Sequence, residues 1–403
     1  MREYADFQEI AHCGGKATFT IASDADGQVS YQISFENSRP TPAEVVGIYA
    51  MAPQGISVAD FRLGGIGEAF DPPMPENCIP VLLGSDTHTC WGHECRRCRG
   101  YFRNKHHTAV YPLTCPYCGL RQAAHHFLTA AQRKYIQHYV NTLILALQEE
   151  MAPHTEKQVV IDMDSIVDQS KDAPRPDFYY AAITQQTRFK CEKCDEFNDI
   201  RGRYGYCAAC GWRNNSSQLR MEFDRLRNEL NENKITPENA VRSAVSNFDA
   251  CCRNYAAQLA RRIPMKPTRR TNLERLLFHD TESAAIEWMR SAFDIDLLRG
   301  VSNPLFIKKM MHRRHIFEHN GGVADKKYVK ESGDAEAQEG MLIRENTANA
   351  HDLISGLMKM TENFDADFHE IFRPTQWPIT YFQERKARMR QRRGEPTSGP
   401  QST

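Results

Sequence analysis

The chain has no long apolar run and no excess of charge of either sign. Its 403 residues carry 51 Lys and Arg against 51 Asp and Glu, so the net charge does not indicate a class of partner, and only local clusters can. No stretch is apolar enough to span a membrane, and the first residues, MREYADFQEI, lack the pattern of a signal peptide. We therefore expect neither membrane insertion nor secretion, and a cytoplasmic location.

Cysteine is plentiful, but its spacing does not indicate disulfides. Of the 13 cysteines, eight fall into four Cys-x-x-Cys pairs. In a long, charged chain this pattern is typical of metal ligands under reducing conditions.

The four pairs form two sets that could each bind one ion. The first set is Cys95, Cys98, Cys115 and Cys118, and the second is Cys191, Cys194, Cys207 and Cys210. Four thiolates at this spacing can surround Zn²⁺ tetrahedrally. We predict two structural zinc ribbons, at residues 89–120 and 186–216, which are either duplicated or unrelated. Since closed four-thiolate sites leave no position for water, we expect no catalytic metal.

The first ribbon also contains a basic and aromatic segment between its cysteine pairs. Its cations are Arg96, Arg97, Arg99, Arg103 and Lys105, and its aromatic residues include Tyr101 and Phe102. Such a composition can hold nucleic acid, although a run of charge also commonly faces only water. A nucleic acid or a protein is the partner that we expect at the ribbons.

The remaining segments predict a multidomain α+β protein. Alternating apolar residues at 17–22 and 29–35 indicate a β-hairpin within a small β-rich module over residues 1–88, whose role the sequence does not identify. Residues 121–185 are expected to hold an amphipathic helix and a linker, and residues 217–378 an all-α bundle. The arginine-rich, polar residues 379–403 predict a disordered basic tail.

One stretch of the helical region carries residues suited to catalysis. Residues 305–323 read LFIKKMMHRRHIFEHNGGV. Apolar residues at helical spacing predict one buried face, and Gly321 and Gly322 indicate that the helix ends just after His319. A histidine can donate and accept a proton near neutral pH, and Arg314 has a stem long enough to reach the same cleft.

This stretch resembles the signature of the HEPN superfamily, an Arg followed by a polar residue and then by a His a few residues later. Arg314, His315 and His319 match that signature, and Asn320 with the two glycines is similar to its HNGG continuation. The resemblance extends over roughly residues 217–375. It implies an all-α domain that dimerises and places two copies of the motif in one cleft, commonly as a metal-independent RNase in toxin–antitoxin, abortive-infection or CRISPR-associated systems.

Two functions follow as hypotheses. In the first, RNA is cleaved by transesterification, with His319 moving the proton of the 2′-hydroxyl, Arg314 stabilising the phosphoryl charge, and His315 and Asn320 orienting the phosphate. In the second, the protein is a non-catalytic binder whose ribbons hold nucleic acid or a protein and whose helical domain only dimerises. A basic helix end that simply faces water is the alternative for the motif itself.

Overall fold

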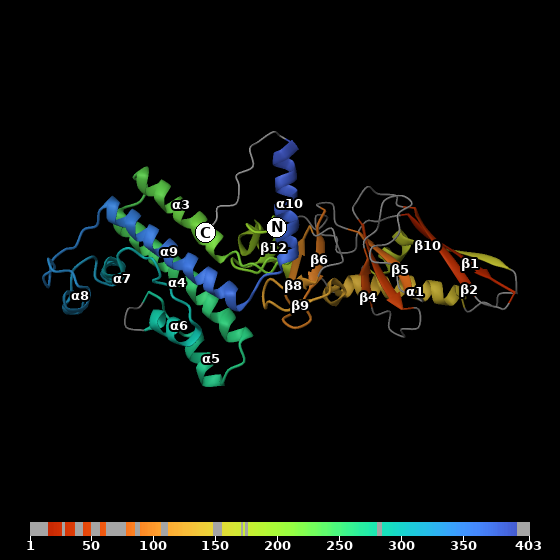
Figure 1. Cartoon of the computed structure of the whole chain (residues 1–403), viewed down its shortest axis with the longest axis horizontal. Helices are drawn as coiled ribbons and strands as arrows, with labels where there is room; N and C mark the ends of the chain where they lie inside the picture. The colour runs from red at the N-terminus through yellow and green to blue at the C-terminus, as the bar shows by residue number, and fades with distance from the viewer. Residues whose placement is uncertain are drawn as a thin grey trace. The chain divides into compact units, whose positions relative to one another are not determined.

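The computed structural model describes residues 15–25, 29–36, 43–49, 57–61, 78–84, 89–105, 112–147, 155–170, 172–173, 176–279 and 284–392. The chain divides into two compact units, Met1–Gly211 with Thr375–Thr403, and Trp212–Pro374. The first mixes strands and helices and the second is helical, as the predicted α+β class requires (Figure 1). None of the helices in the described ranges has the length and apolarity to cross a membrane.

The predicted hairpin is confirmed as β1 (Lys16–Ser23) and β2 (Val29–Glu36). Strand β1 lies in the middle of an antiparallel sheet, with β2 on one side and β10 (Glu156–Asp162) on the other. A second antiparallel sheet has the order β4 (Ser57–Phe61), β3 (Ala43–Tyr49) and β5 (Cys78–Gly84).

Both small sheets share a core with α1 (Ala130–Leu147) and α2 (Met163–Gln169). Phe19 of β1, Val81 of β5, and Tyr135 and Tyr139 of α1 are all buried there. The predicted module of residues 1–88 is therefore incomplete, because β1 needs β10 as its second neighbour and α1 as its cover. Both lie far along the chain.

The two predicted zinc ribbons share one antiparallel sheet. Its order is β11 (Gln186–Lys190), β12 (Phe197–Arg201), β7 (Tyr101–Asn104) and β6 (Trp91–Glu94). Strands β7 and β12 come from different ribbons and pair directly, with Asp199 opposite Arg103. The short pair β8 (Leu113–Thr114) and β9 (Arg121–Gln122) and the 3-10 turns η2 (Ala124–Phe127), η3 (Asp177–Tyr180) and η4 (Ile183–Gln185) complete this part.

The predicted disordered tail is wrong over its first half. Residues Gln376–Arg392 form helix α10, and most of its side chains are exposed. Gln, Glu, Lys, Arg, Ala and Met all favour helix locally, so this segment is helical with little burial. Residues 393–403 of the predicted tail lie outside the described part of the chain.

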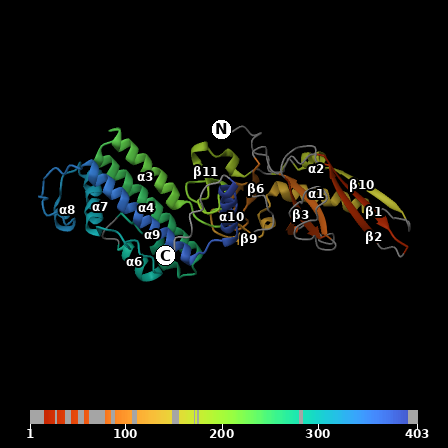
Figure 2. The same ribbon diagram turned by 45° about the horizontal axis from the view of Figure 1, so that its top comes forward.

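The second unit is a helical bundle, as predicted, with bounds at 212–374 rather than 217–378. Its helices are α3 (Asn215–Asn231), α4 (Pro237–Arg262), α5 (Pro267–Glu274), α6 (Ala285–Phe293), α7 (Pro304–His319), α8 (Lys326–Glu331) and α9 (Thr347–Ile371). The long helix α4 packs against α3, α5, α7 and α9, and it runs beside α9 in both views (Figures 1 and 2). Cys251 and Cys252 of α4 are fully buried and pack in the core of the bundle.

Helix α7 is positioned by its start and by a close approach to α9. The Asn303 side chain accepts a hydrogen bond from the Phe306 amide at 3.0 Å, which caps the helix before Pro304. Ile307 then packs on Gly356 of α9, where a Cβ would lie 2.3 Å from the Ile307 Cδ1 atom. A side chain at position 356 would therefore require the Ile307 side chain to shift.

Candidate functional site

Helix α7 ends as the sequence predicts, which places His319 at its last residue. The Ile316 carbonyl accepts hydrogen bonds from the amides of Asn320, at 2.9 Å, and Gly322, at 3.0 Å. Gly321 and Gly322 have φ angles of 60° and 87°, a backbone region that glycine adopts without strain. His319 is consequently exposed at the end of a fixed helix.

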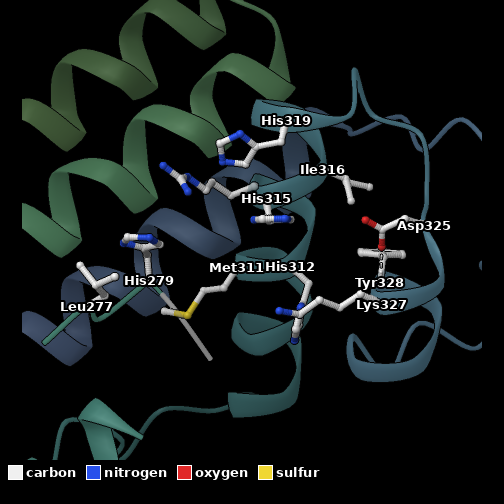
Figure 3. A pocket seen from close by; sticks show the side chains of 11 residues that line it. Leu277, His279, Met311, His312, His315, Ile316, His319, Asp325, Lys327 and Tyr328 are labelled. Carbon is white, nitrogen blue, oxygen red and sulfur yellow. Dashed lines mark hydrogen bonds between the residues drawn. The ribbon is translucent and has the colours of Figure 1, made fainter. Parts of the chain in front are cut away.

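The motif residues line a cavity of about 260 Å³ in the helical unit. Arg314, His315 and His319 all contribute to its wall, and Figure 3 shows the side chains of the two histidines. The imidazole rings of His315 and His319 are 4.8 Å apart between centroids. The structure thus brings together three of the four residues that the sequence singled out.

Asn320 has a different position. It does not line the cavity but donates a hydrogen bond from its amide group to Asp325 Oδ2 at 2.7 Å. Asp325 in turn caps α8, since its other oxygen accepts from the Tyr328 amide at 2.7 Å. Asn320 therefore ties the end of α7 to the start of α8.

The charge state of the cavity follows from its neighbours. Burial, and the proximity of His319, lower the pKa of His315 below its ordinary value, and burial together with Lys308 lowers the pKa of His312. The Tyr328 amide holds the pKa of Asp325 low. Two neutral imidazoles and one carboxylate therefore face the cavity near neutral pH.

Arg314 can use its guanidinium within the cavity. Its Nε atom is buried and makes no hydrogen bond to the described residues. Because Arg314 lines the cavity, a phosphate oxygen there would suit the donors of its guanidinium.

Arg313, one residue earlier, has an unrelated role that the sequence did not reveal. Its guanidinium bonds Asp334 and Glu345 at 2.8 Å each and the Tyr328 hydroxyl at 3.1 Å. Burial alone would lower the pKa of Arg313, but these bonds raise it above its ordinary value. The run of basic residues from His312 to His315 is therefore not a simple solvated face.

His279 is a further residue of the cavity wall that the sequence analysis missed. Its Nδ1 atom is 3.0 Å from Oδ1 of Asp249, a buried carboxylate of α4. The only sequence feature that pointed to this pair was Asp249, an acidic residue among the apolar positions of the predicted helical region.

The two cysteine clusters have the geometry of four-thiolate metal sites. In each, all four Sγ atoms lie within 4.8 Å of one another. The Sγ–Sγ distances include 3.7 Å for Cys95 with Cys118, 3.6 Å for Cys98 with Cys115, 3.6 Å for Cys191 with Cys210, and 3.5 Å for Cys194 with Cys207. Zn–S bonds of about 2.3 Å give tetrahedral edges of about 3.8 Å, so both clusters fit Zn²⁺.

Four turns of similar shape hold these sulfur atoms. In each, the amide of the residue after the second cysteine donates to the carbonyl of the first, at 2.8 Å to 3.0 Å. The residues with those amides, Arg99, Gly119, Asp195 and Gly211, all have positive φ angles. Each cysteine pair therefore presents its two sulfur atoms from the same kind of turn.

The thiols of each cluster also influence one another electrostatically. A hydrogen bond from Cys115 lowers the pKa of Cys95, whereas one with Cys118 raises the pKa of Cys115. Four sulfur atoms so close cannot all ionise without a compensating cation. The donor set therefore matches the chemistry of a thiolate-bound metal.

The basic and aromatic segment of the first ribbon is only partly available to a ligand. Tyr101, Phe102 and Arg103 are buried, and Arg103 lies 3.6 Å from Asp199 across the β7–β12 pair. Arg96, Arg97 and Arg99 are exposed. The two aromatic side chains are thus part of the core, while three arginines remain at the surface.

Comparison of the chain with protein-family models, with curated proteins and with solved structures finds no match.

Proposed function

We propose that the chain is a metal-independent endoribonuclease that acts through Arg314 and His319. The observation that carries this proposal is the single cavity lined by Arg314, His315 and His319. These side chains can supply proton transfer and charge stabilisation from the protein itself, which are the two needs of phosphodiester transesterification.

In the proposed reaction the 2′-oxygen of RNA attacks the adjacent phosphorus. His319 accepts the proton of the 2′-hydroxyl, and the Arg314 guanidinium stabilises the charge that develops on the phosphoryl oxygens. The 2′-O–P bond forms, the P–O5′ bond breaks, and the products carry a 2′,3′-cyclic phosphate and a 5′-hydroxyl. His315, whose pKa is lowered by partial desolvation and by His319, can orient the phosphate as a hydrogen-bond donor.

The active form is proposed to be a homodimer with two motifs in one cleft. Val323, Met341 and Leu342 are exposed apolar side chains just beyond His319. They are held together by the Val323–Leu342 bridge and by the hydrogen bond from Ala324 to Met341. Such a patch beside the cavity supports an interface there.

The proposed setting is an effector of bacterial defence or of a toxin-type system, which is what the resemblance of residues 314–322 implies. Zinc would have a structural role in this protein, held by the eight cysteines of the two clusters. It would fix the four knuckles and leave the RNA chemistry to the helical unit.

The experiment is cleavage of single-stranded RNA by purified full-length protein and its variants. Arg314→Ala and His319→Ala should each lower the rate by at least about 100-fold, the usual effect of removing an acid–base or charge-stabilising group. The matched controls are Arg290→Ala, at an exposed position of α6, and His351→Ala, at a half-buried position of α9, both outside the cavity lining. Light scattering should give the same oligomeric state for all five proteins. Full cleavage by His319→Ala would exclude the site.

A second function has separate support. Arg96, Arg97 and Arg99 at the first knuckle, with the exposed cations of α10, favour a non-catalytic protein that binds nucleic acid. RNA binding that is lost in an Arg96→Ala, Arg97→Ala double variant, together with no cleavage by the wild type, would establish this function instead.

A further inference from the structure

The cavity contains a second histidine system that comes from another part of the bundle. His279 follows α5 and lines the same cavity as His315 and His319 of α7. Figure 3 shows the three imidazoles near one another, although their segments are well separated in the sequence. A substrate phosphate in this space would meet groups from both segments.

Asp249 fixes His279 through both its backbone and its ring. Its Oδ1 atom accepts hydrogen bonds from the amides of Phe278, at 2.7 Å, and His279, at 3.2 Å. The same oxygen lies 3.0 Å from His279 Nδ1. Because Nδ1 is occupied by the carboxylate, Nε2 is the nitrogen left to act on a ligand.

The neighbours of Asp249 keep its side chain ionised, so that it can orient the His279 ring. Burial alone would raise its pKa, but the hydrogen bond and charge of His279 and the two amides lower it, so that Asp249 is a carboxylate at neutral pH. Arg253 of the same helix approaches it at 3.9 Å. A buried carboxylate that orients an imidazole also stabilises the protonated ring, as in hydrolytic triads.

A transesterification needs an acid as well as a base. The 5′-oxygen leaves as an unstable alkoxide unless a proton is supplied to it, and His319 is already assigned to the 2′-hydroxyl in the proposed function. Two imidazoles in one cavity can divide these tasks, one neutral and one protonated.

Resting on that proposed function, we propose that His279 is the general acid of the reaction and that Asp249 is its positioning residue. As the 2′-O–P bond forms, the 2′-hydroxyl proton passes to His319. As the P–O5′ bond breaks, the Nε2 proton of His279 passes to O5′. The reaction ends with His319 protonated and His279 neutral, and exchange with water restores both.

The other charged groups of the cavity are compatible with this assignment. Helix α7 contributes His312 and Arg314 besides the two motif histidines, and Asp325 and Lys327 come from the cap and the first turn of α8. Asp325 is bonded to Asn320 and to the start of α8, whereas the His279 ring contacts the carboxylate of Asp249.

The test compares two RNA substrates that differ at one atom. One is ordinary single-stranded RNA, and in the other a sulfur replaces the 5′-bridging oxygen at the cleavage site. A thiolate leaves without being protonated, so it does not need a general acid. The His279→Ala variant should cleave ordinary RNA at least about 100-fold more slowly than the wild type. It should cleave the sulfur substrate at close to the wild-type rate.

The controls separate an acid from a structural residue. His319→Ala should be inactive on both substrates, and His351→Ala should be active on both. Asp249→Asn keeps an oxygen for the two amides but lacks the charge, so its defect should also be confined to the oxygen substrate. His279→Gln serves in place of His279→Ala if circular dichroism shows that the alanine variant is unfolded.

The possible failures are distinguishable. If His279→Ala cleaves ordinary RNA as the wild type does, or is equally slow on both substrates, His279 is not the acid, while the Arg314–His319 site still holds. If wild-type protein cleaves neither substrate, the proposed function itself fails and the acid assignment fails with it.

Discussion

At the scale of single residues, two adjacent arginines of α7 have opposite surroundings. The Arg313 side chain is 12% exposed and contacts two carboxylates that are less exposed still. Arg314 lines the cavity, and its Nε atom has no hydrogen bond to the described residues. The first is placed to support the fold and the second to meet a ligand.

This difference predicts opposite consequences for two alanine variants. Arg313→Ala leaves Asp334 and Glu345 without their cation and should lower the free energy of unfolding by about 3–5 kcal/mol. Arg314→Ala removes no such pair and should change it by less than about 1 kcal/mol. Chemical denaturation of both variants measures this, and a stable Arg313→Ala protein would contradict the role assigned to the buried network.

The buried position of His312 should make the stability of the protein depend on pH. Burial lowers its pKa in the folded protein, so the unfolded chain binds the proton more tightly. The free energy of unfolding should therefore be unaffected above about pH 6.5, the ordinary value, and should fall as the pH drops below it.

Denaturation of wild type and His312→Gln between pH 7.5 and pH 5 checks this sign. The variant should lose less stability over that range, because it lacks the group that is protonated on unfolding. Arg313 holds the pKa of Asp334 low in spite of its burial. Asp334 therefore affects the pH dependence of stability only at more acidic pH. An equal or steeper decline in the variant would show that His312 is not responsible.

At the scale of elements, the two ribbons should lose their metal together. The pairing of β7 with β12 joins them in one sheet, and structural zinc sites supply about 10–16 kcal/mol of folding free energy. Cys191→Ser should therefore reduce bound zinc from two ions per chain to well below one.

Metal analysis of purified protein measures this outcome. Cys252→Ala, at a buried cysteine of α4 that is not part of either cluster, is the matched control and should retain two ions. Exactly one ion remaining in Cys191→Ser would mean that the ribbons fold independently in spite of the shared sheet.

Helix α10 is the element whose surface best suits a phosphate backbone. Arg385, Lys386, Arg388 and Arg390 are exposed, and Trp377 and Tyr381 stack with ring centroids 5.2 Å apart. If these cations contact RNA, replacing all four by Gln should reduce the slope of log affinity against log salt by up to about 3 for a single strand. Fluorescence anisotropy over a salt series measures it, and an unchanged slope would exclude the contact.

At the scale of the whole molecule, the sequence predicts what is local and misses what is distant. The cysteine spacing, the end of α7 at His319 and the apolar faces of the helices are set by neighbours along the chain, and each is found in the structure. The pairing of β10 with β1, the shared ribbon sheet and the Asp249–His279 pair depend on contacts between residues that are far apart in the sequence. No periodicity or spacing encodes them.

The candidate site shows the same division. Arg314, His315 and His319 could be selected because they lie within one turn or two of a single helix. His279 lines the cavity because the buried carboxylate of Asp249, on another helix, holds it there. The function of Arg313 depends on Asp334 and Glu345, which come from two later segments. A sequence motif therefore identifies the site residues that lie close together in the chain, but not those that distant segments contribute.

In the proposed function, Arg314 and His319 act on a sugar–phosphate link of RNA. The most direct measurement is the end chemistry of fragments released from a labelled single-stranded RNA by wild-type protein and by His319→Ala. We predict a 2′,3′-cyclic phosphate and a 5′-hydroxyl at each wild-type cut, no cut where the upstream sugar is 2′-deoxy, and no fragments above background with the variant. Wild-type cuts that carry a 5′-phosphate, or that persist at a 2′-deoxy position, would contradict the claim.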